Sequence, residues 1–136
     1  MNSNVEKPTI INLQSMADSR GKINVLESFF PIMRIYSISG VKPDLVRGRH
    51  GHRTLKQIFI SQSGQFTIKL NDGYSELKFQ LNSPKSALYV PEGYWRELVD
   101  FSEDCICLVL ASDYYDKNDY IFEFNEFVEW KKKQIL

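Results

Sequence analysis

The chain has 136 residues, of which 43% are hydrophobic and 25% are charged, a composition typical of one globular domain with its own core. The 17 Lys and Arg residues balance the 17 Asp and Glu residues, which argues against a general nucleic-acid-binding protein, because such proteins depend on a basic excess. The sequence holds no run of the roughly 20 apolar residues that a membrane span requires, and its N-terminus lacks the apolar segment of a signal peptide. We therefore expect a single cytoplasmic domain over residues 1–136 that binds neither nucleic acid nor membrane.

Short β-branched and aromatic runs, separated by turn residues, follow one another from Thr9 to Ala111. This spacing predicts an all-β sandwich or barrel of nine or ten strands. The first run, Thr9–Leu13, is apolar and has no hairpin partner nearby in the sequence, and proteins often cover such unpaired edges by forming a twofold dimer. We expect a homodimer whose interface uses this segment, with strand exchange as a variant. The alternative is a monomer in which the segment closes its own barrel.

The clearest predicted element is a hairpin over residues 65–81. Apolar and polar residues alternate over 65–70 and again over 76–81, and Asn71-Asp72-Gly73 turns the chain between them. A later run, Cys105–Ala111, predicts a strand buried on both sides. Its two cysteines, Cys105 and Cys107, lie two residues apart on one face and are poor disulfide partners, so we expect free thiols in a reducing compartment.

After Asp113 the apolar spacing changes from that of a strand to that of a helix. The residues that recur at helical spacing are Tyr120, Ile121, Phe124, Phe127 and Val128. Asp116, Asn118 and Asp119 precede or accompany them and are residue types that cap helices. We predict a barrel over about 9–112 and an amphipathic C-terminal helix within about 116–134 that docks its aromatic face on the barrel.

The two histidines of the chain, His50 and His52, lie two residues apart. On a strand, residues two apart point to the same face. A solvent-exposed pair is the ordinary interpretation of such a motif, but the surrounding motifs favour a functional one.

The His-x-His motif, Gly64 twelve residues after it and the later Pro91-Glu-Gly93 resemble the two motifs of the cupin superfamily, small β-barrels that usually bind a metal through three histidines and a glutamate. Here Gln57 stands at the glutamate position and Arg96 at the position of the third histidine. An amide is a poor metal ligand, and a guanidinium has no lone pair to offer. We therefore expect a cupin without metal or other cofactor, whose imidazoles are free for acid–base chemistry.

A closer resemblance covers residues 12–127. The motifs that carry it are Asp18-Ser-Arg-Gly21, Arg34-Ile-Tyr36, Arg47-Gly-Arg-His-Gly-His52, Leu88-Tyr-Val-Pro91, Trp95-Arg-Glu97, Asp100-Phe-Ser102, Leu108-Val-Leu-Ala-Ser-Asp-Tyr-Tyr-Asp116 and Asp119-Tyr-Ile121. The sequence is similar to the dTDP-4-keto-6-deoxyglucose 3,4-ketoisomerase family, which is related to the cupin-like domain of fused sugar-modifying proteins. The resemblance implies a dimeric cupin-type jelly roll that converts a dTDP-linked keto sugar on the way to the 3-amino-sugars of surface polysaccharides.

The chain departs from that family at two positions. Gly51 stands where Ala is expected, a difference that we expect to be harmless. Arg96 stands where some members carry His, which leaves the role of this position open.

Moving a carbonyl from C4 to C3 of the sugar requires removal of the C3 proton, an enediol intermediate and protonation of C4, without a redox cofactor. A histidine with a pKa near neutrality suits the first step. We predict His52 as the C3 base, His50 as the partner acid and Tyr36 as donor to the developing oxyanion. A half-buried strand aromatic is an equally good interpretation of Tyr36.

Four further side chains are predicted to bind the substrate: Arg20, Arg47, Arg96 and Gln57. Guanidinium groups match the phosphate oxygens of a nucleotide. Arg47 shares a face with His50 only if Gly48 marks a bulge. Arg20 as an ordinary surface charge is the alternative interpretation.

Two other functions stay open. A nucleotide-sugar epimerase on a related barrel would use a His base but leave the ketone at C4. A cupin that only binds a sugar or nucleotide would not require the paired histidines, which favour catalysis.

Overall fold

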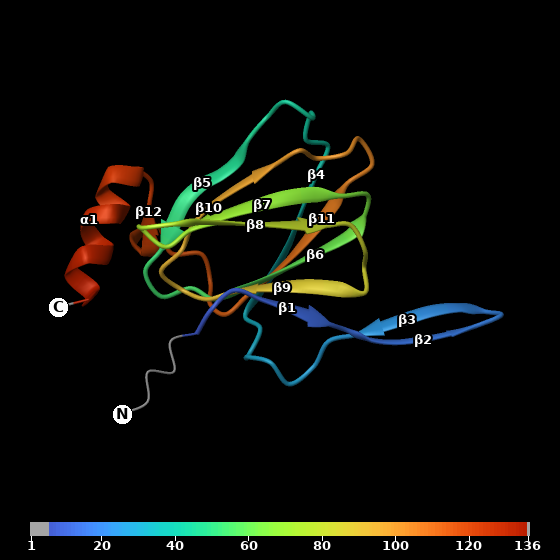
Figure 1. Cartoon of the computed structure of the whole chain (residues 1–136). Coiled ribbons are helices and arrows are strands. Elements are labelled where there is room, and N and C mark those ends of the chain that lie inside the picture. Colours follow the sequence, from blue (N-terminus) through green and yellow to red (C-terminus); the bar gives the residue numbers. More distant parts are fainter. Residues whose placement is uncertain (1–5, 136) are drawn as a thin grey trace.

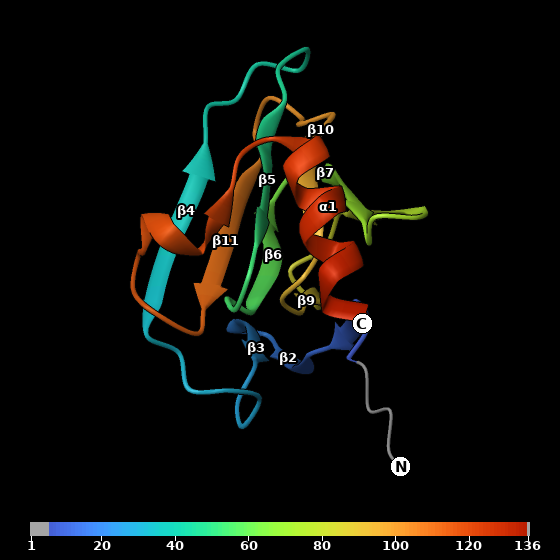
Figure 2. The ribbon, with the colours of Figure 1, turned by 90° about the vertical axis from the view of Figure 1, so that its left-hand side faces the viewer.

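The computed structural model describes residues 6–135, which form two five-stranded antiparallel sheets facing each other, a separate hairpin and a C-terminal helix (Figures 1 and 2). The strands of the first sheet are, in spatial order, β1 (Thr9–Asn12), β9 (Ser86–Val90), β6 (Gln57–Ser63), β11 (Ile106–Ala111) and β4 (Arg34–Ser39). Those of the second are β12 (Tyr120–Ile121), β5 (Arg47–His52), β10 (Trp95–Val99), β7 (Phe66–Asn71) and β8 (Glu76–Leu81). The hairpin consists of β2 (Gln14–Asp18) and β3 (Gly21–Val25), and the helices are the 3-10 helix η1 (Lys117–Asp119) and α1 (Phe124–Ile135). The predicted all-β fold with a short C-terminal helix is confirmed. Between Thr9 and Ala111 the structure has eleven strands instead of nine or ten, and β12 follows outside that range.

The hydrophobic core lies between the two sheets and follows the alternation seen in the sequence. Phe66, Ile68 and Leu70 of β7 are completely buried in it, and β7 pairs with β8 from Phe66 opposite Leu81 onward. The predicted hairpin over 65–81 is therefore confirmed. Leu77 is nonetheless 44% exposed, because β8 is the outer strand of its sheet.

The prediction of a strand buried on both sides over Cys105–Ala111 is wrong for its first part. Cys105 and Cys107 point into the core and are free thiols, as expected. On the outer face of β11, however, Ile106 is 42% exposed and Leu108 is half-buried, and Leu110 is the first buried side chain on this face. A second apolar cluster, which includes Phe30, covers that outer face only near Leu110.

The N-terminal segment divides into a paired strand and a projecting hairpin. β1 pairs with β9 of the same chain, from Thr9 opposite Tyr89 onward. The β2–β3 hairpin then extends away from the two sheets (Figure 1), and nearly all of its residues are exposed, Met16 and Ile23 among them. Our sequence analysis did not predict this hairpin, because an element without a buried face shows no apolar alternation.

The C-terminal segment wraps the outer side of β5. Asp116 caps η1 by accepting a hydrogen bond from the Asn118 backbone N–H at 3.0 Å, and β12 follows at the edge of β5. Because η1 and β12 intervene, the helix begins at Phe124 and not near 116. α1 docks beside β5 (Figure 2) through the buried Phe127, which packs against Trp95, as the aromatic face predicted.

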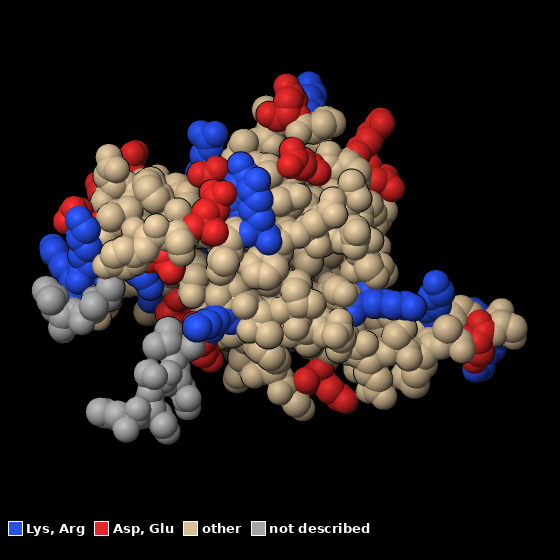
Figure 3. Space-filling view, viewed as in Figure 1, with Lys and Arg blue, Asp and Glu red and all other residues tan. Residues whose placement is uncertain are grey.

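The surface is mixed in charge: on the face shown in Figure 3, Lys and Arg side chains are interspersed with Asp and Glu. Neither helix of the described residues 6–135 is long and apolar enough to cross a membrane.

Candidate active site

A cavity of about 570 Å³ opens between the sheets, where β4 faces β5. Both sheets and the C-terminal segment contribute to it. The lining residues are Arg34, Tyr36, Ser37, Ile38, Ser39, Gly40, Val41, Leu45, Arg47, Gly48, His50, Gln57, Phe59, Arg96, Leu98 and Tyr120. The cavity thus gathers five of the seven predicted site residues; the exceptions are His52 and Arg20.

A bulge in β5 directs two of these side chains into the cavity. Arg96 of β10 pairs with His50, whereas the next residue pairs with Gly48, so Arg49 is the extra residue of the bulge. Gly48 has φ +90°, a conformation that favours glycine, and a Cβ there would lie 3.1 Å from the Arg96 carbonyl oxygen. The bulge that Arg47 requires in order to share a face with His50 is present, and both residues line the same cavity.

His50 is held in a single tautomer. Its Nδ1 lies 3.1 Å from the Gly48 carbonyl oxygen, which can only accept a hydrogen bond. Nδ1 therefore carries the proton and Nε2 the lone pair. Burial, together with the nearby Arg96 charge and His52, lowers the pKa of His50 to about 3. At neutral pH the imidazole is an uncharged base.

His52 lies behind His50, and the centroids of the two rings are 4.8 Å apart. Its Nδ1 donates to the Asp119 carboxylate at 2.9 Å, while its Nε2 is buried and has no partner among the described residues. His52 lines a separate cavity of about 30 Å³. Burial lowers the pKa of His52 to about 4, although Asp119 opposes the shift. The pKa of both imidazoles thus lies well below the near-neutral value expected from the sequence.

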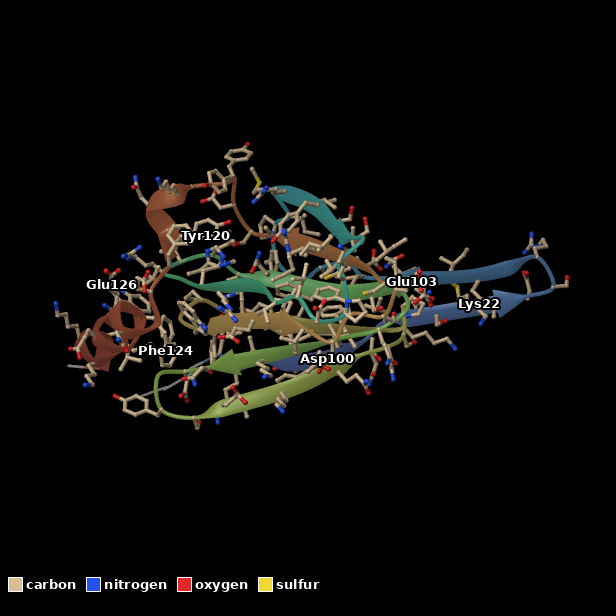
Figure 4. All side chains as sticks on the ribbon, turned by 90° about the horizontal axis from the view of Figure 1, so that it is seen from above. Lys22, Asp100, Glu103, Tyr120, Phe124 and Glu126 are labelled. Atoms are coloured by element: carbon tan, nitrogen blue, oxygen red, sulfur yellow. The ribbon has the colours of Figure 1, made fainter. Side chains whose placement is uncertain are left out.

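The C-terminal segment supplies two site residues that our sequence analysis did not assign. Burial raises the pKa of Asp119, but hydrogen bonds from His52 and Thr54 outweigh this effect and bring the pKa to about 2. The Tyr120 ring lies 4.8 Å from the ring of His50 and 4.4 Å from that of His52, and it lines both cavities (Figure 4). The motif Asp119-Tyr-Ile121 was the sequence feature that could have pointed to both residues. Its contact with the histidine strand could not be predicted, because the two segments lie 67 residues apart in the chain.

A chain of hydrogen bonds links Arg96 to Tyr36. The completely buried Arg96 donates to the Gln57 Oε1 and, at 2.8 Å, to the Tyr94 carbonyl oxygen. The Gln57 amide donates in turn to the Tyr36 hydroxyl at 3.0 Å. Because this hydroxyl accepts from Gln57, its own proton is free for a group in the cavity. Burial raises the pKa of Tyr36, so that the hydroxyl stays protonated.

The same residues do not fit a metal. Gln57 and Arg96 occupy two ligand positions of the cupin motifs and bind each other. Burial lowers the pKa of Arg96 to about 10, so the guanidinium is charged at neutral pH and would repel a cation. Within residues 6–135 no three His, Cys, Asp or Glu side chains form a group that could hold a metal ion.

Two arginines differ from expectation. Arg20 lies at the turn of the β2–β3 hairpin, pairs with Asp18, and has an 87% exposed side chain outside the cavity lining. Figure 4 shows Lys22 of this hairpin far from the cavity residue Tyr120. Arg34, which the sequence analysis did not assign to the site, lines the cavity with its guanidinium 4.6 Å from the centre of the Tyr36 ring.

Comparisons with known proteins identify the family to which the chain belongs. The protein-family model described as "FdtA: WxcM-like, C-terminal" matches residues 6–132. A curated protein of Aneurinibacillus thermoaerophilus, TDP-4-oxo-6-deoxy-alpha-D-glucose-3,4-oxoisomerase, is 38% identical over 128 residues, which are 91% of this chain and 92% of that one.

Solved structures are similar over nearly their whole length. The sugar 3,4-ketoisomerase QdtA of Thermoanaerobacterium thermosaccharolyticum, in complex with TDP, has a TM-score of 0.92 and 36% identity over 97% of this chain and 99% of that one. A His-to-Asn mutant of QdtA, in complex with TDP-4-keto-6-deoxyglucose, has a TM-score of 0.91 and 36% identity over 100% of this chain and 99% of that one. The TDP-quinovose 3,4-ketoisomerase WlaRB of Campylobacter jejuni has a TM-score of 0.87 and 40% identity over 92% of this chain and 99% of that one. These likenesses confirm the cupin-type fold and the predicted resemblance.

Proposed function

Since this chain belongs to the family of TDP-sugar 3,4-ketoisomerases, we propose that it moves the keto group of a dTDP-4-keto-6-deoxyhexose from C4 to C3 within the cavity between its sheets. One observation carries the proposal: the uncharged His50 base and the Tyr36 hydroxyl line one cavity, each held by a defined hydrogen bond.

The first half of the reaction forms the enediol. The Nε2 lone pair of His50 removes the C3 proton, which the adjacent ketone acidifies, and the electrons of the C–H bond form a C3–C4 double bond. Tyr36 donates its proton to the oxygen on C4 as negative charge develops there. The Arg96 charge, which acts on Tyr36 to lower its pKa, stabilises the tyrosinate that results.

The second half returns both protons. The hydroxyl on C3 gives its proton to the tyrosinate and becomes the new carbonyl. The imidazolium of His50 is now a strong acid and protonates C4. Each protein group regains its starting state, so the reaction needs neither a redox cofactor nor a metal, and the ring nitrogen of one histidine serves both carbons.

This scheme differs from the roles predicted from the sequence: His50 acts as both base and acid, and His52 transfers no proton. His50 is partly exposed to the large cavity, whereas the Nε2 atom of His52 is buried away from solvent. His52, fixed by Asp119, is suited to support the ring of His50 from behind.

Substrate binding is assigned to the cationic lining of the cavity. Arg47 lies at the start of β5 and has the charge to hold the diphosphate, while Arg96 and Gln57 act through Tyr36.

We also propose a homodimer in which the β2–β3 hairpin packs against a second copy. The hairpin exposes Met16 (49%) and Ile23 (60%), and the outer face of the first sheet exposes Ile35 (62%). Arg20 is remote from the cavity of its own chain, so its predicted contact with the nucleotide requires the cavity of the partner. Light scattering that gives a mass of 15.9 kDa at micromolar concentration would contradict the dimer.

The free, buried thiols of Cys105 and Cys107 fit a reducing compartment, and the proposed location is the cytoplasm. The 3-keto product is a substrate for an aminotransferase, which places the reaction before formation of a dTDP-3-amino-sugar.

Incubation with dTDP-4-keto-6-deoxyglucose, followed by NMR of the sugar carbons, tests the proposed activity. We expect the carbonyl signal to move from C4 to C3. A changed configuration with the ketone still at C4 would identify an epimerase, and an unchanged sugar would identify a binding protein.

A further inference from the structure

Gly51 is the point of closest approach between the histidine strand and the C-terminal helix. A Cβ at this position would lie 2.6 Å from Cδ1 and 2.9 Å from Cε1 of the Phe127 ring. Real Cβ atoms essentially never approach another heavy atom so closely. Gly51 is therefore needed for space, and the Ala that the family resemblance suggested is not a harmless exchange in this chain.

The Phe127 ring has little freedom to move away from Gly51. It is completely buried, and its centroid lies 6.0 Å from that of Trp95 and 6.1 Å from that of Trp130. Protein interiors are packed closely enough that one added methyl group must displace its neighbours. The backbone of Gly51 is fixed as well, because it pairs with Trp95 on one side and with Ile121 on the other.

The strand geometry connects this contact with the cavity. Side chains alternate between the two faces of a strand, so His50 and His52 point to one face while the Cα of Gly51 faces Phe127 on the other. A displacement of Gly51 moves both imidazoles together. It also disturbs the bond from His50 to the Gly48 carbonyl and the bond from His52 to Asp119.

We propose that Phe127 is a positioning residue of the ketoisomerase: its ring, seated on Gly51, sets the place of both histidines from outside the cavity. Helix α1 thereby belongs to the catalytic apparatus although none of its residues lines the large cavity. The expected effect on kcat rests on the proposed function. The coupling between Phe127 and the positions of the two histidines does not.

The structural coupling can be measured without substrate. The chain has only two histidines, so protein made without a histidine tag gives imidazole NMR signals from His50 and His52 alone. We expect Gly51→Ala to shift the ring nitrogen signals of both. The matched control is Lys132→Ala on the same helix, because this side chain is 57% exposed and is not among the atoms nearest Gly51, and it should leave both signals in place.

The kinetic test is a double-mutant cycle. A shift of reacting groups by about 1 Å can lower the reaction rate about 100-fold. We therefore expect Gly51→Ala to lower kcat about 10- to 100-fold and to change KM less than about 3-fold. Gly51→Ala with Phe127→Ala should recover at least about 5-fold of this loss, because the new methyl group occupies space that the ring has left.

Several results would overturn the proposal. These are unchanged imidazole signals in Gly51→Ala, a kcat of this variant within about 2-fold of the wild-type value, or a double variant whose loss equals the product of the two single losses. If Gly51→Ala does not fold, Phe127→Leu replaces it in the NMR experiment, and unchanged signals in that variant would overturn the proposal equally. Shifted signals in a protein without ketoisomerase activity would refute the proposed function and leave the coupling intact.

Discussion

The histidine strand β5 and the β2–β3 hairpin differ in how their strands are paired and covered. β5 pairs with β10 and β12 along its two edges and is covered on its outer side by α1. The two strands of the hairpin pair only with each other, and nearly all of their residues are exposed. β5 thus has its partners within the same chain, and the hairpin leaves its side chains exposed.

The two regions also differ in the burial of an arginine. Arg96 is completely buried, and its hydrogen bonds to Gln57 and Tyr94 fix its place. Arg20 pairs with Asp18, two residues away, and both side chains lie in solvent, where water weakens the attraction. The proposed function therefore assigns the chemistry to the buried interior and substrate binding to the hairpin, and the two assignments can be tested separately.

The largest effect is expected at the base. His50→Asn removes the group that carries the proton, and general acid–base groups contribute about 100- to 10,000-fold, so kcat should fall by a factor in that range. His52→Asn is the matched variant, and its loss should be at least about 10-fold smaller because His52 does not line the large cavity. Steady-state kinetics with the keto sugar measures both. A larger loss in His52→Asn would restore the assignment made from the sequence.

The next effect concerns the oxyanion. Tyr36→Phe removes a single donor, which costs about 100- to 1,000-fold in comparable sites, and kcat should fall accordingly while KM changes little. Tyr115→Phe is the control, because its ring lies nearby but is 58% exposed and outside the large cavity. A kcat of the Tyr36 variant within about 3-fold of the wild-type value would exclude this tyrosine as a proton donor.

The buried histidines also make stability depend on pH. The pKa of His52 is about 4 in the folded protein against 6.5 for the ordinary group, so the unfolded chain binds more protons between these values. The contribution of His52 should therefore lower stability as the pH drops below 6.5, and this contribution should level off below about 4. From about pH 7 to about pH 4.5 this residue accounts for roughly 2–3 kcal/mol.

Urea unfolding at several pH values measures this dependence. In His52→Asn the decline between about pH 7 and about pH 4.5 should shrink, leaving the part due to His50, whose pKa is also lowered. The Asp119 carboxylate, with a pKa of about 2, contributes only at more acid pH. Equal declines in wild-type and variant proteins would show that His52 titrates normally in the fold.

The smallest effect is expected on the hairpin. Arg20→Ala should raise KM about 10-fold, as expected for loss of about 1.4 kcal/mol of binding energy, with kcat nearly unchanged. Lys22→Ala, an exposed cation on the same hairpin, should leave both constants unchanged. If the Arg20 variant binds like the wild type, this arginine is an ordinary surface charge.

Sequence alone predicted the parts of the molecule whose pattern is local. The alternation over 65–81 reflects one buried face, the bulge at Gly48 follows from glycine inside a strand, and the His50–His52 pair follows from strand geometry. The residue types at positions 57 and 96 could be read from the sequence, whereas the hydrogen bond between Arg96 and Gln57 could not.

The parts that sequence reasoning missed depend on contacts between distant segments. Asp119 binds His52 across 67 residues of chain, and Phe127, near the end of the chain, lies against Gly51. Neither has a periodic signature. The exposure of His50 relative to His52 depends on which of two same-face side chains lies nearer the opening of the cavity, which the period of a strand does not encode.

Exchange of the sugar C3 proton with solvent deuterium tests the central claim most directly, namely that His50 moves the proton. The keto sugar is incubated in D₂O with wild-type, His50→Asn and His52→Asn proteins. NMR follows deuterium at C3 of the remaining 4-keto sugar, because C3 of the product is a carbonyl and carries no hydrogen. We expect exchange to be lost in His50→Asn and to persist in His52→Asn. Exchange at the wild-type rate in His50→Asn would contradict the assignment of this histidine as the base.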